Sequence, residues 1–198
     1  MNAQLLMSSC LTAIAADVGV RYWFYQVTST NHLVCLIGAG PNLLYQHFDW
    51  TLRNCDQRYP SHPEFGYDSE TGKVGTYKSD IVMPYLNFST IIQVKRISGR
   101  LEIGSGPVFI QDEDDHLLRQ KSMQGDLTGA GVKGEAEIRY DLTKHLFALA
   151  RITALSIQAT GVQTQKGYGD DIAEWHAKID EKFSLTSINS SMAVGYAF

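Results

Sequence analysis

The segment Ala130-Gly131-Val132-Lys133-Gly134-Glu135-Ala136-Glu137-Ile138-Arg139-Tyr140-Asp141-Leu142 alternates between two kinds of side chain along its length. Its even-numbered positions are apolar or small, and its odd-numbered positions from Lys133 to Asp141 are all charged. Successive side chains of a β-strand point to opposite sides of the sheet, so this pattern predicts a strand with one apolar face and one polar face.

The same period of two recurs before and after this segment. It is found in the ranges 17–24, 47–53, 82–94, 148–154 and 192–198. We therefore expect about seven antiparallel strands in a single all-β domain that spans residues 1–198. Helical structure is expected only within the last long connection, at 171–182.

The predicted connections come in two sizes. Short turns are expected at 28–31, 95–99 and 141–144, and long polar loops at 54–75, 112–125 and 166–184. Short and long connections alternate along the chain. This order is typical of outer-membrane β-barrels, which have tight turns on the periplasmic side and long loops outside.

Composition excludes several classes of protein. The 198 residues carry a formal net charge of −4 with scattered basic residues, which argues against a nucleic-acid partner. Three cysteines without a CxxC motif exclude a disulfide framework and a zinc site, and we expect no metal and no cofactor. No apolar run is long enough for a transmembrane helix, although a barrel strand needs only about ten alternating residues.

A soluble sandwich or a lipocalin-like binder would also show alternating strands, with the apolar face turned inward. Three features favour a membrane barrel: long strands, a ladder of charges in the middle of 130–142, and aromatic residues near the strand ends. These aromatics are Trp50, Tyr140, Tyr196 and Phe198. Aromatic girdles and a polar lumen are typical of transmembrane barrels.

The run Asp112-Glu113-Asp114-Asp115-His116 contains the best candidates for chemistry. On an extended segment, Asp112, Asp114 and His116 share one face of the sheet. A carboxylate beside a histidine can fix its tautomer and raise its basicity, as a general base requires. The alternative is a solvated acidic loop that happens to contain a histidine.

Two further stretches give this run a context. Tyr77-Lys78 and Met83-Pro84-Tyr85 precede the acidic segment at a spacing that resembles the omptin family of outer-membrane proteases. The resemblance covers essentially the whole chain and matches the C-terminal two-thirds of the family's proteins. It implies an antiparallel transmembrane β-barrel in the bacterial outer membrane, with about seven of the family's ten strands present and the N-terminal strands missing.

The resemblance also implies an activity, that of an aspartic-type endopeptidase cutting near basic residues. Asp114 would orient His116, His116 would activate the attacking water, and Asp112 would help to bind the basic side chain before the scissile bond. The implied partners are outer-membrane lipid, including lipopolysaccharide, and a peptide or protein substrate.

The sequence departs from the family pattern in two respects. The family completes its site with a pair of aspartates on an earlier loop, whereas the acids before Cys55 are only Asp17 and Asp49. Ranges 43–48 and 79–81 lack the arginines that contact lipopolysaccharide in the family. These departures favour an alternative, a non-catalytic outer-membrane barrel of omptin ancestry that serves as an adhesin or structural porin.

An incomplete barrel is also costly in lipid, because each unpaired backbone group at an open edge costs several kcal/mol. Bacterial single-chain barrels have an even number of strands, from eight upward. We therefore expect the chain to be a fragment of a longer product, to have a misassigned start, or to come from a decayed gene. A closed barrel of eight strands that recruits residues 1–10 is a further possibility.

Overall fold

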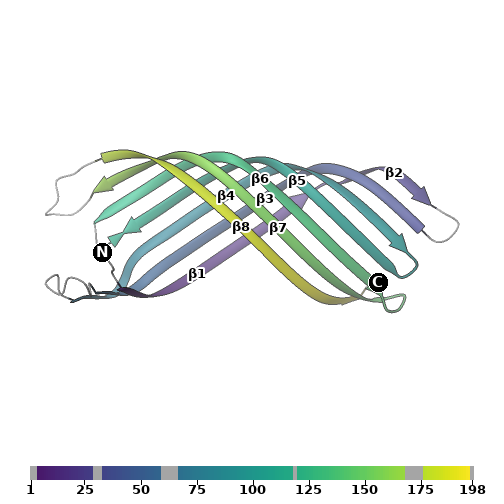
Figure 1. Cartoon of the computed structure of the whole chain (residues 1–198), viewed down its shortest axis with the longest axis horizontal. Coiled ribbons are helices and arrows are strands. Elements are labelled where there is room, and N and C mark those ends of the chain that lie inside the picture. Colours follow the sequence, from purple (N-terminus) through teal and green to yellow (C-terminus); the bar gives the residue numbers. More distant parts are fainter. Residues whose placement is uncertain (1–3, 29–32, 59–66, 118–119, 168–175, 197–198) are drawn as a thin grey trace.

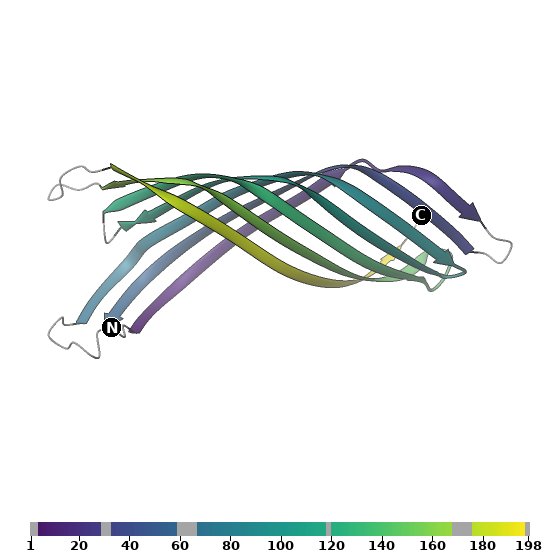
Figure 2. The same ribbon diagram turned by 45° about the horizontal axis from the view of Figure 1, so that its top comes forward.

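Long, strongly tilted antiparallel strands make up nearly all of the protein (Figure 1). The computed structural model describes residues 4–28, 33–58, 67–117, 120–167 and 176–196. The strands are β1 (Gln4–Gly19), β2 (Tyr22–Thr28), β3 (Leu33–Arg58), β4 (Tyr67–Val94), β5 (Ile97–His116), β6 (Lys121–Asp141), β7 (Leu146–Gly167) and β8 (His176–Tyr196). All belong to one sheet, which curves into a half-barrel (Figure 2). The all-β prediction is confirmed.

The eight strands occupy seven positions across the sheet, because β1 and β2 share one position. This agrees with the prediction of about seven strands. From β3 to β8 each strand pairs with the next, and β1 and β2 both pair with β3. The register shows that β1 and β2 lie end to end on the same edge, since Gly19 pairs with Asn42 and Tyr22 with Ala39.

The break between β1 and β2 falls inside the range 17–24, where one continuous strand was predicted. Val20 still donates its N–H to the carbonyl oxygen of Pro41 over 3.1 Å. A Cβ atom on Gly40 would collide with the carbonyl oxygen of Val20, so only glycine admits this close approach. The interruption is thus a local kink in one strand position, and β1 extends back to Gln4.

The N-terminal residues do not form an additional strand position. Residues 4–6 pair with the far end of β3, and β1 does not pair with β8 in the described part of the chain. The closed eight-stranded barrel that recruits residues 1–10 is therefore wrong.

The long loops predicted at 54–75, 112–125 and 166–184 are mostly strand. β3 runs to Arg58, β4 starts at Tyr67, β5 ends at His116 and β6 starts at Lys121. The helix predicted at 171–182 is wrong from His176 onward, where β8 begins, and residues 171–175 lie outside the described residues. The ends of β3 to β6 were missed because both of their faces carry polar side chains, so the alternating signal disappears, whereas the start of β8 still alternates from Ile179 onward.

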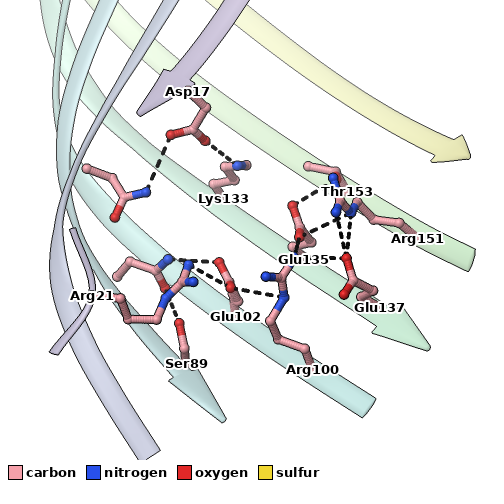
Figure 3. Close-up of polar contacts among 12 residues, drawn as sticks. Asp17, Arg21, Ser89, Arg100, Glu102, Lys133, Glu135, Glu137, Arg151 and Thr153 are labelled. Atoms are coloured by element: carbon pink, nitrogen blue, oxygen red, sulfur yellow. Dashed lines mark hydrogen bonds and ion pairs between the residues drawn. The ribbon is translucent and has the colours of Figure 1, made fainter. Parts of the chain in front are cut away.

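The charged face of the 130–142 segment lines the inside of the half-barrel, as predicted. Figure 3 shows it in a network with residues from other strands and with Arg21. Arg100 contacts Glu135 over 2.7 Å and Glu137 over 2.9 Å, while Arg151 contacts Glu137 over 2.6 Å. The network also contains the ion pairs Arg21–Glu102 and Lys133–Asp17. It balances four cations against four carboxylates, which offsets the cost of burying charge.

An apolar cluster fills the inner face next to this network. It consists of Leu44, Ile81, Met83, Tyr85, Val108, Ile110, Leu127, Leu155, Ile157 and Ala159, with Phe48, Phe183 and Leu185 packed against it. Ile81, Met83, Val108 and Ile157 are completely buried. The cluster separates the charged network from the inner face of the strand ends near His116, so those strand ends sit on a rigid packed base.

The outer face is apolar over the same length of strand. Ile138, Ile152, Ile188 and Met192 point outward, and the last two are 74% and 90% exposed. Toward the ends of the strands near His116 most outward residues become polar, as in the row of register partners Asp80, Gln111, Asp126 and Asp180, where Val162 is the one apolar member. No helix among the described residues is long and apolar enough to cross a membrane.

Candidate active site

The acidic run predicted to carry chemistry forms the last residues of β5. Asp112 pairs with Ser79, Asp114 with Tyr77 and His116 with Gly75 on one neighbouring strand. The structure places Asp112, Asp114 and His116 on the inner face, beyond the apolar cluster and level with the polar part of the outer face. They are therefore held on a strand, instead of on the solvated loop that is the alternative.

Asp114 and His116 are in direct contact. His116 Nε2 lies 3.1 Å from Asp114 Oδ2, and the two side chains are 40% and 28% exposed. A carboxylate that accepts the Nε2 proton leaves Nδ1 as the basic nitrogen of the ring. Burial raises the pKa of the Asp114 carboxyl, and the neighbouring His116 and Lys121 oppose this shift. The pair has the geometry that orients a histidine as a general base.

Asp112 lies deeper than the other two residues, with only 7% of its surface exposed. The Tyr77 hydroxyl donates a long hydrogen bond of 3.5 Å to Asp112 Oδ2. Burial raises the pKa of Tyr77 to about 12, so this hydroxyl stays protonated at neutral pH. The other oxygen of Asp112, Oδ1, is buried and has no hydrogen-bond partner.

The structure adds Glu181 of β8 to this group, a residue that sequence reasoning missed. Burial, and next the Asp112 carboxylate beside it, raise the pKa of Glu181 to about 7. The range 166–184 was interpreted as a loop, although Ile179, Glu181, Phe183 and Leu185 alternate with Asp180, Lys182 and Ser184. That alternation is the signal that could have found it.

A row of polar side chains crosses the site from β6 to β8. Lys121 Nζ donates to Gln165 Oε1 over 3.4 Å, Gln165 Nε2 to Gln163 Oε1 over 2.9 Å, and Gln163 Nε2 to Glu181 Oε1 over 3.5 Å. This row fixes one oxygen of Glu181 and keeps the Lys121 ammonium near Asp114.

Asp17 and Asp49, the two acids that precede Cys55, do not lie near His116. Asp17 accepts hydrogen bonds from Tyr85 and Lys133 in the charged network. Asp49 pairs in register with Lys78 on the outer face. Neither acid faces His116, so Asp17 and Asp49 do not supply the aspartate pair that the omptin resemblance implies.

The ranges 43–48 and 79–81, which lack the arginines that the omptin resemblance implies, carry a cluster of other polar side chains on the outer face. The Tyr45 hydroxyl donates to Asp80 Oδ1 over 2.6 Å, and His47 Nδ1 lies 3.0 Å from the same oxygen. Within the described ranges, no group of three or more His, Cys, Asp or Glu residues could hold a metal ion.

Comparisons with known proteins show the fold. No family model and no curated protein sequence matches the chain. The crystal structure of the outer membrane protease OmpT from Escherichia coli superimposes with a TM-score of 0.69 at 13% identity, covering 94% of this chain. The chain spans 64% of the length of that protease. A similarity to the membrane pore complex of Pneumolysin has a TM-score of 0.12 at 7% identity and carries no weight.

The half-barrel is therefore similar in fold to an outer-membrane protease. At 13% identity the similarity shows the fold alone, and the roles of Asp112, Asp114 and His116 stay predictions.

Proposed function

We propose that this chain is part of an omptin-like endopeptidase of the bacterial outer membrane that cuts peptides beside basic residues. The observation that carries the proposal is the Asp114–His116 contact of 3.1 Å on the inner face, at the end of the strands. The similarity of the fold to an outer-membrane protease supports it.

The proposal gives each residue a role in the hydrolysis. His116 Nδ1 takes a proton from a water molecule while the water oxygen bonds to the carbonyl carbon of the peptide. Asp114 stabilises the imidazolium that forms, and that proton then passes to the leaving amine as the C–N bond breaks. Asp112 binds the basic side chain that precedes this bond. Carboxylates that position the water from across the barrel mouth would come from outside the described residues.

The two faces of the sheet support a location in the outer membrane. The outward apolar side chains of β4 to β8 suit lipid tails, whereas contiguous apolar patches of this extent are rare on soluble proteins. This counts against the lipocalin-like binder. The strand ends that carry His116 lie opposite the short turns near Lys95 and Thr143, so in this proposal they face outward, where lipopolysaccharide is a further partner.

The proposal is tested on the native protein extracted from an outer-membrane fraction, with a fluorogenic peptide that contains one Arg-Arg pair. His116→Ala should lower turnover to the background rate. His145→Ala is the matched control, because His145 lies in the short turn at the opposite end of the strands. Turnover that is the same in His116→Ala and in wild type would rule out the assigned role of His116.

The second candidate is a non-catalytic barrel of omptin ancestry. It is favoured by the position of Asp17, which is engaged with Lys133 and Tyr85 and is not near His116. The apolar cluster on the inner face argues for an adhesin or structural barrel over a water-filled pore. This candidate predicts surface binding that survives the double substitution Asp114→Asn and His116→Ala.

A further inference from the structure

A groove of about 750 Å³ lies on the outward face of the sheet, next to the turn between β4 and β5. Gly99 forms its floor, because the register places this glycine between Ile92 of β4 and Ile138 of β6. A Cβ atom on Gly99 would have its nearest neighbour, the Glu137 carbonyl oxygen, 4.0 Å away, so the space above residue 99 is open. The remaining apolar walls of the groove are Val94, Ile97 and Tyr140.

A second groove, of about 460 Å³, lies on the other side of Ile138 and Tyr140. The small side chains of Ala148 and Ala150 form its floor, and Met192 of β8 lies beyond them. Ile138 and Tyr140 therefore form a ridge on β6, called the β6 ridge below, with an apolar groove on each side.

Two cations lie at the turn end of the first groove. Lys95 and Arg96 are the residues of the turn between β4 and β5, and both are exposed and line the groove. Asp141 donates its backbone N–H to the Arg96 carbonyl oxygen, but its carboxylate contacts Arg139 over 2.8 Å. Within the described ranges neither Lys95 nor Arg96 has an ion-pair partner, so both charges are available to an anion.

The backbone also holds Lys95 in a costly conformation. Its φ is 52°, in the left-handed region that glycine and asparagine adopt most readily in tight turns. A lysine at this position does not ease the turn, and a function for its side chain would account for the strain.

We propose that the β6 ridge binds one glycerophospholipid with an anionic head group. One acyl chain lies in each groove, and Lys95 and Arg96 hold the phosphate. The inference rests on the outer-membrane location proposed above and is independent of the endopeptidase activity. Tyr140 suits the boundary between chains and head group, because its ring is apolar and its hydroxyl is polar.

Two features distinguish this place from the rest of the lipid-facing surface. Open grooves give an acyl chain contacts on several sides, and each buried CH₂ group adds to the binding free energy. Basic residues at the membrane surface attract anionic head groups more strongly than zwitterionic ones. An anionic phospholipid should therefore bind more tightly than a zwitterionic phospholipid with the same chains.

The test is native mass spectrometry of the full chain in detergent micelles. The probe is dioleoylphosphatidylglycerol, and dioleoylphosphatidylcholine is its zwitterionic counterpart with identical acyl chains. We expect one molecule of the anionic probe to bind at least about tenfold more tightly. Lys95→Gln and Arg96→Gln together should remove this preference. Lys144→Gln removes a charge from the turn between β6 and β7 at the same end of the strands, and it should change binding less than about twofold.

A steric pair of variants tests the first groove. Gly99→Leu fills the open space on its floor and should weaken binding of the anionic probe at least about tenfold. Gly134→Leu is the matched control, because Gly134 also faces outward on β6 and its Cβ atom would likewise have its nearest neighbour 4.0 Å away. The second groove is tested with oleoyl-lysophosphatidylglycerol, whose single chain should also lower the affinity at least about tenfold.

The outcomes separate this inference from the proposed function. Equal affinity for the anionic and zwitterionic probes, or binding that Gly99→Leu leaves unchanged, would overturn the lipid site even if Arg-Arg peptides are cleaved. Equal affinity for the one-chain and two-chain probes would overturn the assignment of a chain to each groove. Selective binding that depends on Lys95, Arg96 and Gly99 in a protein without peptidase activity would retain the lipid site and overturn the endopeptidase.

Discussion

Arg100 is the inner-face residue whose removal should destabilise the half-barrel most clearly. It contacts Glu102 over 3.2 Å, Glu135 over 2.7 Å and Glu137 over 2.9 Å, and these carboxylates are only 10% to 13% exposed. Removal of one partner from a buried ion pair costs about 3–5 kcal/mol. Glu102 retains Arg21 and Glu137 retains Arg151, whereas Glu135 retains a longer contact of 3.4 Å to Arg151 and a hydrogen bond of 3.5 Å from the Thr153 hydroxyl. We therefore expect Arg100→Met to cost about 3 kcal/mol, at the lower end of that range.

The assay is urea unfolding of the protein folded in lipid vesicles, followed by tryptophan fluorescence. Arg96→Met is the control, since Arg96 is exposed in the turn between β4 and β5 and should change the unfolding free energy by less than about 0.5 kcal/mol. Adding Glu135→Gln to Arg100→Met should recover part of the loss, because it removes the uncompensated charge. A cost of less than about 1 kcal/mol for Arg100→Met would refute the interpretation of this network as a buried, charge-balanced one.

Three further results are expected. Asp114→Asn should lower kcat about 10²- to 10⁴-fold with little change in KM, because it disturbs the orientation of His116 and leaves substrate binding intact; steady-state kinetics would check this. Ile157→Ala should destabilise the protein by about 2–5 kcal/mol and Ile157→Val by about 0.5–1.5 kcal/mol, since Ile157 is completely buried; equal effects in urea unfolding would contradict the packing. The folded-state pKa of Glu181, about 7, lies above its ordinary value of 4.5, so the folded state holds the proton more tightly and the unfolding free energy should fall as pH rises from 4.5 to 7. Glu181→Gln should flatten that fall, and an unchanged pH dependence of the unfolding midpoint would argue against the shifted carboxyl.

The alternating segments predicted the architecture because the middle part of most strands separates apolar from charged side chains. Lys133, Glu135 and Glu137 face the inside of the half-barrel while Ile138 and Tyr140 face out. The signal fails where both faces are of one kind. Residues 11–16 of β1 are apolar or small on both sides, and the start of β4 and the end of β5 are polar on both sides.

The candidate site was predictable only within one strand. The spacing of two residues places Asp112, Asp114 and His116 on one face of β5, as the structure shows. Glu181 of β8 joins them across two intervening strands, β6 and β7, and that proximity depends on the register of three strand pairings. Local spacing carries no information about such a register, so a lone glutamate near the end of the chain gave no indication of a partner.

The site of peptide cleavage is the measurement that bears most closely on the proposed endopeptidase. Native protein from an outer-membrane fraction would be incubated with a peptide that has one Arg-Arg pair and one Ala-Ala pair, and the products would be weighed by mass spectrometry. We expect a single cut between the two arginines, which disappears in His116→Ala. A cut at the same bond in His116→Ala, or no cut beside arginine in wild type, would contradict the assignment of Asp114 and His116 to hydrolysis.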